Sequence, residues 1–500
     1  MQEDSGQAHG LGRWLLAVAV VLSVIIVLIV VRTLLHVPLS STSSDEIVVD
    51  IDDEVAAGHL AAAIRFVTVS HQDPAQRDEQ AFEDFIAWIA ATYPALGQHM
   101  QLQRFNDTLL YKWQGDNPAL APILLTGHYD VVPVIPGTEN LWQQPPFGGV
   151  IADGIVWGRG ALDDKSGVVG ILEAANYLLQ TGYQPARTVY LSFGHDEEVG
   201  GAAGAGKVAE ALAAEGVQLA WSLDEGSFVF DGLLPGIEPM TAMINVAEKG
   251  SVSLEIVARG AGGHSSMPPK QTAVGILAAA IVKLEAQQVA GGLEGLSLQM
   301  FDTVSRYMPF LPRMMFANQW LFGPLLDEQL SGAATTNAML RTTTAPTMLS
   351  GSIKSNVLPI EAKAVVNFRL HPRDSVASVV AHVERVIGAN DPANHLEVRM
   401  LGKGNAASKV SDWNSAGYAA IEQSVRDIYG DVVITPGLMV AASDSRHYGK
   451  VADNAFRFNP LVVTTADLTG FHGTNEKISV ANFGRGIRGY VQIIRNGSSE

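Results

Sequence analysis

Acidic and histidine side chains recur in this sequence at positions where apolar strands are expected to end. The apolar run that starts at Pro122 delivers His128 and Asp130, two residues apart, and side chains so spaced in an extended segment point the same way. An imidazole and a carboxylate placed like this can share one metal ion or one proton. Alone the pair is a weak signal, because a His-x-Asp pair is more often hydrogen-bonded in a loop.

Later segments repeat this arrangement and together supply a set of ligands. The candidate metal ligands are His128, Asp163, Glu198, Asp224 and His472, with Asp130 and Glu197 beside them. This set is one ligand short of two three-ligand sites unless one carboxylate bridges two ions, and bridged metal pairs activate water for hydrolysis. Of the neighbours Glu197 and Glu198, one can bind metal while the other takes the proton of the water. Asp130 can orient the imidazole of His128.

Structural alternatives exist for the individual motifs. Scattered surface acids and core histidines would need no metal, but they would not recur at glycine-flanked strand ends. Asp163 or Asp164 can instead cap the helix expected after Gly167. The glycine-rich turn before that helix lacks the spacing of a phosphate-binding loop, and its two acids would repel a phosphate, so a nucleotide site is excluded.

The amino-acid composition limits which partners the chain can bind and which side chains can hold a metal. The chain has 33 basic and 51 acidic residues and a formal charge of −18, which repels nucleic acid. It has no cysteine, so neither disulfides nor thiolate metal sites are available. Any metal must be bound by His, Asp and Glu, and this ligand set suits Zn²⁺, Co²⁺ or Mn²⁺.

The N-terminal region predicts a membrane anchor. Residues 14–34 follow a short tail (1–13), are apolar over Trp14 to Val31 apart from Ser23, and lead into a polar linker (35–50). Eighteen residues approach the thickness of the hydrocarbon core. A cleaved signal peptide is the alternative, but its apolar region is usually shorter and ends at small residues. We therefore expect a single-pass membrane protein with its catalytic part outside the cytoplasm.

The remaining chain predicts an α/β fold in two domains. Strands alternate with helices in residues 51–247 and again in 405–495, as in a mostly parallel sheet covered by helices, and ligands bind at the carboxyl ends of such strands. Residues 248–404 predict an inserted α+β domain of ferredoxin-like type, with helices over Thr272–Gln287 and Ser375–Ile387. Its apolar insertion, 298–348, is expected to elaborate a lid or a subunit contact; a surface that leans on a membrane is the minority interpretation.

Six motifs together carry a resemblance to a known family. They are Gly127–Pro133, Gly158–Gly167, Asp196–Gly201, Asp224–Gly226, Gly263–Pro269 and Gly473–Glu476. The set resembles the dinuclear zinc metallopeptidase family of carboxypeptidase S, aminoacylase and carboxypeptidase G. The branch of carboxypeptidase S and the secreted N-acyl-amino-acid hydrolases is the most similar, over roughly residues 50 to 495. The chain departs from the pattern at Ser166, where many members have glycine, and in its long insertion.

The resemblance implies a role for each site residue. Asp163 would bridge two Zn²⁺ ions, with His128 and Asp224 on one ion and Glu198 and His472 on the other. Glu197 would be the general base, and the peptide bond between Asp163 and Asp164 would be cis. The inserted domain would be the family's lid, and the resemblance leaves open a homodimer formed through it. For the substrate, it implies an oxyanion contact from His264 and carboxylate contacts from Asn356 and Arg369; Arg446 is a second carboxylate candidate.

The sequence thus predicts a zinc hydrolase that cleaves an amide bond next to a free carboxylate. Carboxypeptidase action on short peptides is the leading interpretation, and hydrolysis or synthesis of N-acyl amino acids is the alternative. A catalytically silent receptor or scaffold is disfavoured by the intact ligand set and Glu197. A two-metal phosphoesterase is disfavoured because His264 and Arg369 suit an acyl carboxylate better.

Overall fold

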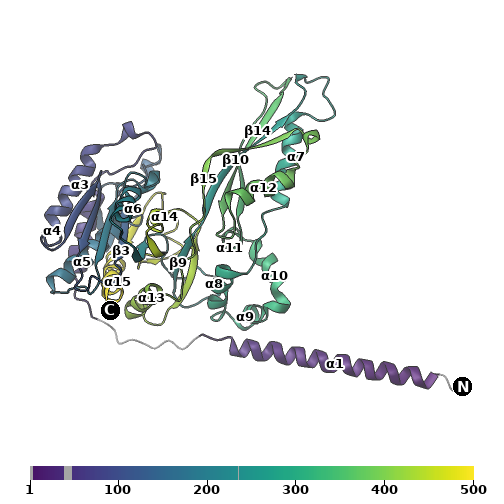
Figure 1. The fold of residues 1–500 in the computed structure, drawn as a ribbon, viewed down its shortest axis with the longest axis horizontal. Coiled ribbons are helices and arrows are strands. Elements are labelled where there is room, and N and C mark those ends of the chain that lie inside the picture. The colour runs from purple at the N-terminus through teal and green to yellow at the C-terminus, as the bar shows by residue number, and fades with distance from the viewer. Residues whose placement is uncertain (1–3, 39–47, 235, 500) are drawn as a thin grey trace.

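The computed structural model describes residues 4–38, 48–234 and 236–499. Figure 1 shows a large α/β body, a smaller body built on an antiparallel sheet, and the long helix α1 (Asp4–Leu35), which projects away from both. The predicted tail (1–13) and linker (35–50) fall partly on residues 1–3 and 39–47, which lie outside the described residues.

The large body contains a ten-stranded sheet whose centre is parallel. In spatial order, β6 (Val189–Gly194), β3 (Ile123–His128), β7 (Leu219–Asp224) and β17 (Ala452–Arg457) are parallel neighbours, and β16 (Val433–Met439) is parallel to β9 (Thr241–Glu248). The sheet is completed by β1 (Gln101–Phe105), β2 (Thr108–Trp113), β8 (Val229–Phe230) and β18 (Val462–Val463). β1, β2 and β6 pair antiparallel, and β9 is antiparallel to both β17 and β8. The expected mixed fold with a mostly parallel sheet is confirmed.

Helices and short elements surround this sheet. The helices are α2 (Asp53–Ile64), α3 (Glu79–Thr92), α4 (Pro94–His99), α5 (Lys165–Gln180), α6 (Ala205–Ala214), α13 (Ala416–Tyr429), α14 (Ser445–Tyr448) and α15 (Val480–Ser498). The 3₁₀ turns are η1 (Pro74–Gln76), η2 (Glu139–Leu141) and η3 (Glu197–Val199), and β4 (Val150–Ala152), β5 (Ile155–Trp157) and β19 (Lys477–Ser479) form a separate small sheet. Several helices begin at an acid or serine whose side chain accepts the first free backbone amides, as Asp52 does for α2 and Ser479 for α15.

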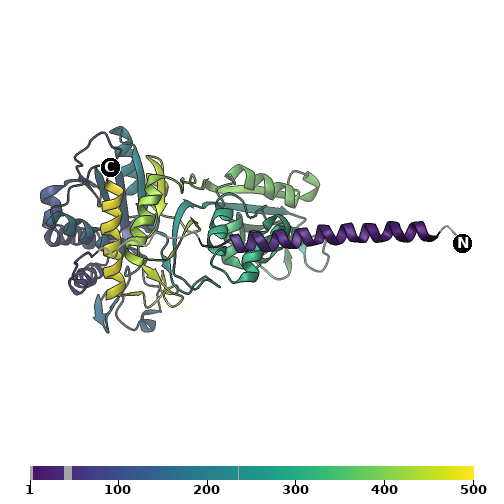
Figure 2. The same ribbon diagram turned by 90° about the horizontal axis from the view of Figure 1, so that it is seen from below.

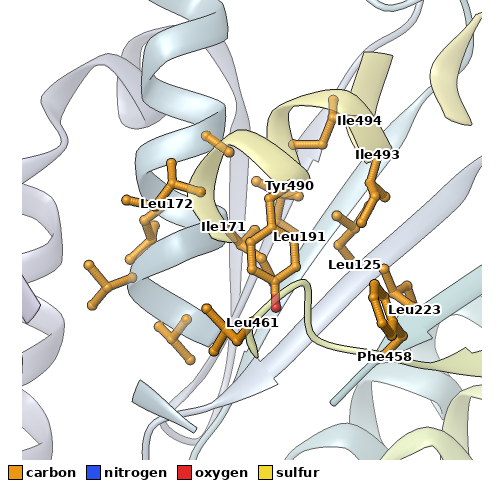
Figure 3. Close-up of a cluster of buried hydrophobic side chains, with 14 of the residues drawn as sticks. Leu125, Ile171, Leu172, Leu191, Leu223, Phe458, Leu461, Tyr490, Ile493 and Ile494 are labelled. Atoms are coloured by element: carbon orange, nitrogen blue, oxygen red, sulfur yellow. The ribbon is translucent and has the colours of Figure 1, made fainter. Parts of the chain in front are cut away.

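Alternation along β3 fixes which side of the sheet each residue faces. Leu125 packs with Leu191 and Leu223 against α5 and α15, as Figure 3 shows. Leu124 faces the other side and packs in the cluster that contains Val208 of α6. Each fully buried leucine contributes about 1.5–3 kcal/mol to folding, so both faces hold β3 in place. The strand end that carries His128 is therefore rigidly positioned.

The smaller body is a four-stranded antiparallel sheet with two helices on one face. Its strands, in spatial order, are β12 (Thr343–Ser350), β14 (Glu361–Leu370), β10 (Gly250–Arg259) and β15 (Leu396–Asn405). The helices are α7 (Ala273–Ala286) and α12 (Val376–Ile387), close to the expected ranges, and short elements are β11 (Gly263–His264), β13 (Val357–Leu358) and η4 (Pro392–Asn394). Alternate residues of β10 and β14, such as Leu254 and Val366, pack beneath the helices. The role of this body as a lid, and the predicted domain boundaries, stay predictions.

Four helices fill most of the predicted insertion. They are α8 (Gly295–Ser305), α9 (Phe310–Ala317), α10 (Gln319–Ser331) and α11 (Ala334–Leu340). Their shared core includes Phe301, Phe316 and Leu326. The end of the predicted insertion differs from expectation, because the chain from Thr343 onward is the edge strand β12 of the smaller sheet.

Helix α1 contains an apolar segment, Arg13–Leu35, with a mean hydropathy of 3.3 over its most apolar window and none of that window buried. It is long and apolar enough to cross a membrane, and a signal sequence would meet the same criterion. Figures 1 and 2 both show its C-terminal end beside the helices of the insertion.

Candidate metal centre

The carboxyl ends of β6, β3 and β7 meet at one edge of the large sheet. His128 is the last residue of β3, Asp224 is the last residue of β7, and the η3 turn with Glu198 follows β6. Because these strands are parallel neighbours, their ends bring the three side chains to the same edge. Two loops add Asp163, just before α5, and His472, after β18.

One carboxylate stands between two histidines. Oδ1 of Asp163 lies 3.1 Å from Nε2 of His128, and Oδ2 lies 3.1 Å from Nε2 of His472. His472 Nε2 is also 3.4 Å from Oε2 of Glu198. Ligand atoms of His128, Asp163 and Glu198 all lie within 4.8 Å of one another, as needed to hold a metal ion. The two oxygens of Asp163 thus face two different histidines, which suits a bridging carboxylate.

Buried polar atoms without partners mark the same place. Oδ1 of Asp224 accepts a hydrogen bond from the amide of Glu225 at 2.9 Å, but its Oδ2 has no partner among the described residues. Oε1 of Glu198 likewise has none within the described part of the chain. A buried carboxylate oxygen without a hydrogen bond is costly, and a bound cation removes that cost.

The electrostatics of the cluster also suit a cation. Burial raises the pKa of Asp224 to about 6 and raises the pKa of Glu198. Hydrogen bonds to Asp163 and Glu198 raise the pKa of His472 to about 10. Without a metal, each of these three groups therefore binds its proton more tightly than its ordinary pKa implies. Metal ligands must be deprotonated, so a divalent ion would replace these protons.

Asp130 orients residues on both sides of the site. Nδ1 of His128 lies 2.9 Å from the backbone carbonyl oxygen of Asp130 and 3.3 Å from its Oδ1, which fixes the ring so that Nε2 faces Asp163. The Asp130 carboxylate also accepts hydrogen bonds from the amides of Glu197 and Glu198 at 3.2 and 3.1 Å. The side chain is fully buried, as an orienting role requires.

Asp164 packs into the loop behind the ligands. The peptide bond between Asp163 and Asp164 is cis, as expected. Oδ1 of Asp164 accepts a hydrogen bond from Nδ2 of Asn459 at 2.9 Å, and its side chain makes no cap for α5. A Cβ atom at Gly127 or Gly167 would approach the Asp164 carboxylate to 2.6 or 2.3 Å. The glycines of the two motifs therefore make room for Asp164, and the helix-cap alternative is wrong for this residue.

A cavity of about 830 Å³ opens over the cluster. Its polar wall includes Asp163, Glu197, Glu198, Glu225 and His472. Its apolar wall consists of Phe228, Phe230, Met439, Val440, Val463, Leu468 and Phe471, among others. Burial raises the pKa of Glu197 well above its ordinary value, as a group that accepts and returns a proton requires.

Two arginines line both this cavity and an adjoining one of about 640 Å³. They are Arg369, from β14 of the smaller body, and Arg446, from α14 of the large body. Neither guanidinium forms a hydrogen bond or an ion pair with another residue in the described ranges 4–38, 48–234 and 236–499. Both are thus available to bind an anionic group in the cavity.

Comparison with known proteins identifies the family. A model of peptidase family M20/M25/M40 matches residues 124–496. The chain belongs to this family. The expected resemblance is confirmed, as is the expectation of a metallopeptidase or amidohydrolase.

Individual relatives of the M20 chain cover nearly its whole length. The N-fatty-acyl-amino acid synthase/hydrolase PM20D1 of Xenopus tropicalis is 38% identical over 447 residues, which are 88% of this chain and 85% of the relative. A probable carboxypeptidase S-like 2 of Dictyostelium discoideum is 36% identical over 451 residues, 89% of this chain and 86% of the relative. The solved M20 family metallo-carboxypeptidase Sso-CP2 from Sulfolobus solfataricus matches with a TM-score of 0.64 at 18% identity, over 89% of this chain and 99% of that one. This last likeness shows the same M20 fold.

Two substrate residues implied by the resemblance lie elsewhere in this M20 chain. His264 and Asn356 are exposed on β11 and beside β13, where the Ser265 amide donates to the Asn356 carbonyl oxygen at 3.1 Å. Neither residue lines the cavity over the candidate metal ligands. Nδ1 of His264 is instead 2.8 Å from the hydroxyl of Ser266. Their contact with substrate stays a prediction, which requires movement of the smaller body or a partner subunit.

Sequence reasoning left three site residues unassigned. Glu225 lines the cavity next to Asp224, and Glu476 holds the loop that carries Asp163. Asp444 is buried, and a Cβ at Gly194 or Gly201 would collide with its carboxylate. The signals for Glu225 and Glu476 were present in the motifs Asp224–Gly226 and Gly473–Glu476. Asp444 lies two residues before Arg446, and its only signal in the sequence is this neighbourhood.

Proposed function

We propose that this M20-family protein hydrolyses the amide bond between an apolar acyl group and an amino acid that has a free carboxylate. The observation that carries the proposal is the cavity itself, in which an apolar wall and two guanidinium groups that form no ion pair with described residues flank one cluster of candidate metal ligands. The apolar wall suits an acyl chain, and Arg369 and Arg446 suit the carboxylate. The scissile amide would lie between them, over the ligands.

The cluster would hold two Zn²⁺ ions, with Co²⁺ or Mn²⁺ as substitutes. Asp163 would bridge, His128 and Asp224 would bind one ion, and Glu198 and His472 would bind the other. Bound metal ions would polarise the amide carbonyl and lower the pKa of water at the site. The close contacts of Asp163 with both histidines and the unpartnered oxygens of Asp224 and Glu198 support this assignment.

Glu197 would act as the proton carrier. It lines the cavity beside Glu198, and its amide is held by the Asp130 carboxylate. The carboxylate would accept a proton from the attacking water and deliver it to the leaving amine nitrogen as the C–N bond breaks. The products are then a free fatty acid and an amino acid, and the reverse reaction would condense them.

The apolar wall favours fatty acyl groups over short peptides. Phe230 lines the cavity and also packs against the hydrophobic core of the insertion, so this core lies directly behind the apolar wall of the site. Among the relatives, one is named an N-fatty-acyl-amino acid synthase/hydrolase and another a probable carboxypeptidase S-like protein. Carboxypeptidase action on short peptides is the second candidate, because it also cleaves an amide bond next to the free carboxylate of an amino acid.

A series of substrates separates the two candidates. The full-length protein, in detergent or nanodiscs with zinc, is assayed on one amino acid with N-acetyl, N-octanoyl and N-palmitoyl groups, and on dipeptides ending in that amino acid. We expect kcat/KM to rise with acyl length, since each buried CH₂ contributes about 0.8 kcal/mol. Faster cleavage of dipeptides than of every acyl derivative would assign the enzyme to the carboxypeptidases instead.

We further propose that α1 is an uncleaved anchor and that the catalytic body lies outside the cytoplasm. The polar contacts between the end of α1 and the insertion support a helix that stays with the mature protein. Mass spectrometry of the protein purified from membranes tests this, because a cleaved signal sequence would leave a chain without residues 14–34.

A further inference from the structure

We infer that α9 and α10 form a second membrane-contacting surface, which rests in the lipid headgroup region beside the anchor helix. The inference rests on the proposed anchoring by α1, and it is independent of which amide the enzyme cleaves. Figures 1 and 2 show these helices next to the end of α1, on the side of the molecule from which the anchor leaves.

Specific polar contacts fasten α1 to the junction of α9 and α10. Nδ2 of Asn318 donates to the carbonyl oxygen of Ile29 at 3.2 Å and lies 3.3 Å from the hydroxyl of Thr33. Nε of Arg32 donates to the carbonyl oxygen of Ala317 at 3.0 Å. Thr33 and Asn318 are both fully buried in this contact.

Contacts just beyond the helix continue the attachment. Nε2 of His36 lies 2.9 Å from the hydroxyl of Ser305, at the end of α8. The guanidinium of Arg306 donates to the carbonyl oxygen of Val37 at 3.3 Å. The anchor is therefore joined to the insertion over at least two turns. The position of α1 in the membrane thus determines where the insertion lies.

The depth of these contacts places the insertion at the membrane surface. Ile29 is inside the apolar segment, six residues before its end at Leu35. At 1.5 Å per residue that is about 9 Å along the helix. Helices that lie in the interface bury their apolar face roughly 5–10 Å deep. A junction that reaches Ile29 is thus at the depth where an interfacial helix lies.

The chemistry of α9 and α10 matches this depth. The 20 residues from Tyr307 to Leu326 contain one charged side chain, Arg313. Several large apolar side chains of this segment are about half exposed: Phe310 (47%), Leu311 (64%), Trp320 (54%), Leu321 (45%) and Leu325 (44%). We call these five residues the apolar ridge. An exposed apolar group of this kind needs a partner, and tryptophan is enriched where a membrane meets water.

A lipid surface is a better occupant than a second copy of the chain. The ridge lies on α9, which packs against α1, and on α10, which begins directly after Asn318 at this contact. The bilayer around α1 can therefore reach the ridge without any association between copies. The core beneath the ridge touches Phe230, which lines the cavity. A membrane-bound ridge would therefore bring the apolar wall of the site close to the source of acyl substrates.

The absence of natural cysteines allows a direct test. Leu311→Cys and Leu321→Cys, each labelled with NBD in the full-length protein, are reconstituted into phosphatidylcholine vesicles with and without acyl-chain spin labels. Leu22→Cys, in the exposed part of α1, reports the anchor. Leu102→Cys is the matched control, because it is 48% exposed on β1, at the opposite end of the large sheet from the strands that contact the insertion.

We expect the spin labels to quench NBD at positions 22, 311 and 321 but not at position 102. Quenching at 22 without quenching at 311 and 321 would overturn the inference and leave the anchor intact. A blue-shifted but unquenched emission at 311 and 321 would overturn it in favour of a second copy. If position 22 is also unquenched, both the anchor and the inference fail, whereas the acyl-length series decides the proposed activity separately.

Discussion

The carboxylate of Glu476 accepts a hydrogen bond from the backbone amide of Asp163 at 3.1 Å. The same oxygen accepts from the amides of Gly160 and Leu162, and the other oxygen accepts from Arg159 at 2.8 Å. A fully buried side chain far along the chain thus holds the loop that presents the central carboxylate of the candidate metal centre.

Replacing Glu476 by glutamine should weaken metal binding. The amide keeps the size of the side chain but loses the charge that pairs with Arg159, so the loop and Asp163 are less firmly oriented. Loss of a group that orients a ligand typically costs about 10–100-fold in metal affinity. Competition with a chelator, followed by zinc analysis, measures the change against Glu139→Gln on the surface. Equal affinity in both variants would contradict the positioning role.

Glu197→Gln should retain metal and lose turnover. The glutamine cannot accept the proton of water, so kcat should fall by at least about 10²-fold. Metal content measured on the same sample separates this effect from loss of the site. Glu215→Gln, at the exposed end of α6, is the control and should keep full activity. A Glu197 variant as active as this control would eliminate Glu197 as the general base.

Removing metal should abolish activity and lower the melting temperature. Without a cation, Asp163, Glu198 and Asp224 lie close together in a mostly buried cluster, where like charges are costly. Dialysis against a chelator, then addition of Zn²⁺ or Co²⁺, should reverse both effects, whereas Mg²⁺ serves as the control ion. A chelated protein that contains no metal and still turns over at full rate would rule out the metal-dependent mechanism.

That most of the candidate ligands lie together could be predicted, because their placement depends on local pattern. His128, Glu198 and Asp224 follow apolar strands that proved to be adjacent and parallel, so their positions in sequence already implied one edge. The glycines beside them were visible as motifs, but the side chains that need the space, Asp164 at Gly127 and Asp444 at Gly201, come from other segments and were not predictable.

Features that depend on the packing of distant segments were not predictable. The contact of Glu476 with the Asp163 loop and that of Asn318 with Ile29 leave no periodic signal in the sequence. The position of His264 depends on how the two bodies are arranged. Strand β12 was missed because Pro346 interrupts its pattern, yet it is an edge strand with an irregular register after Pro346, where proline is tolerated.

Arg369→Gln should raise KM for substrates with a free carboxylate. Loss of a bidentate contact worth about 1.4 kcal/mol corresponds to a tenfold increase in KM. The KM for the amidated analogue, which has no carboxylate anion, should be unchanged. Arg369→Lys should recover only part of the loss, because lysine lacks the planar fork. Arg446→Gln, measured in parallel, shows which arginine binds the carboxylate. Identical effects on acid and amide would mean that Arg369 does not bind the carboxylate.

The stability of the fold should depend on pH through His371. Burial, together with Arg373 and Lys249, lowers the pKa of this histidine to about 3 from its ordinary value of 6.5. Its Nδ1 accepts from the Arg373 amide at 3.3 Å, which requires an unprotonated nitrogen. Between pH 6.5 and 3 the unfolded chain therefore binds a proton that the folded chain does not.

The stabilisation associated with neutral His371 is complete above pH 6.5 and is lost as the pH falls towards 3, by up to about 1.4 kcal/mol per pH unit. The substitution His371→Gln removes this pH-dependent contribution to the free energy of unfolding. The variant also lacks the native contacts of the histidine at every pH. The melting temperature of the unmodified protein should therefore exceed that of the variant most at pH 7.5, and the gap should narrow by pH 5. A gap that stays constant over this range would mean that His371 has the same pKa in both states.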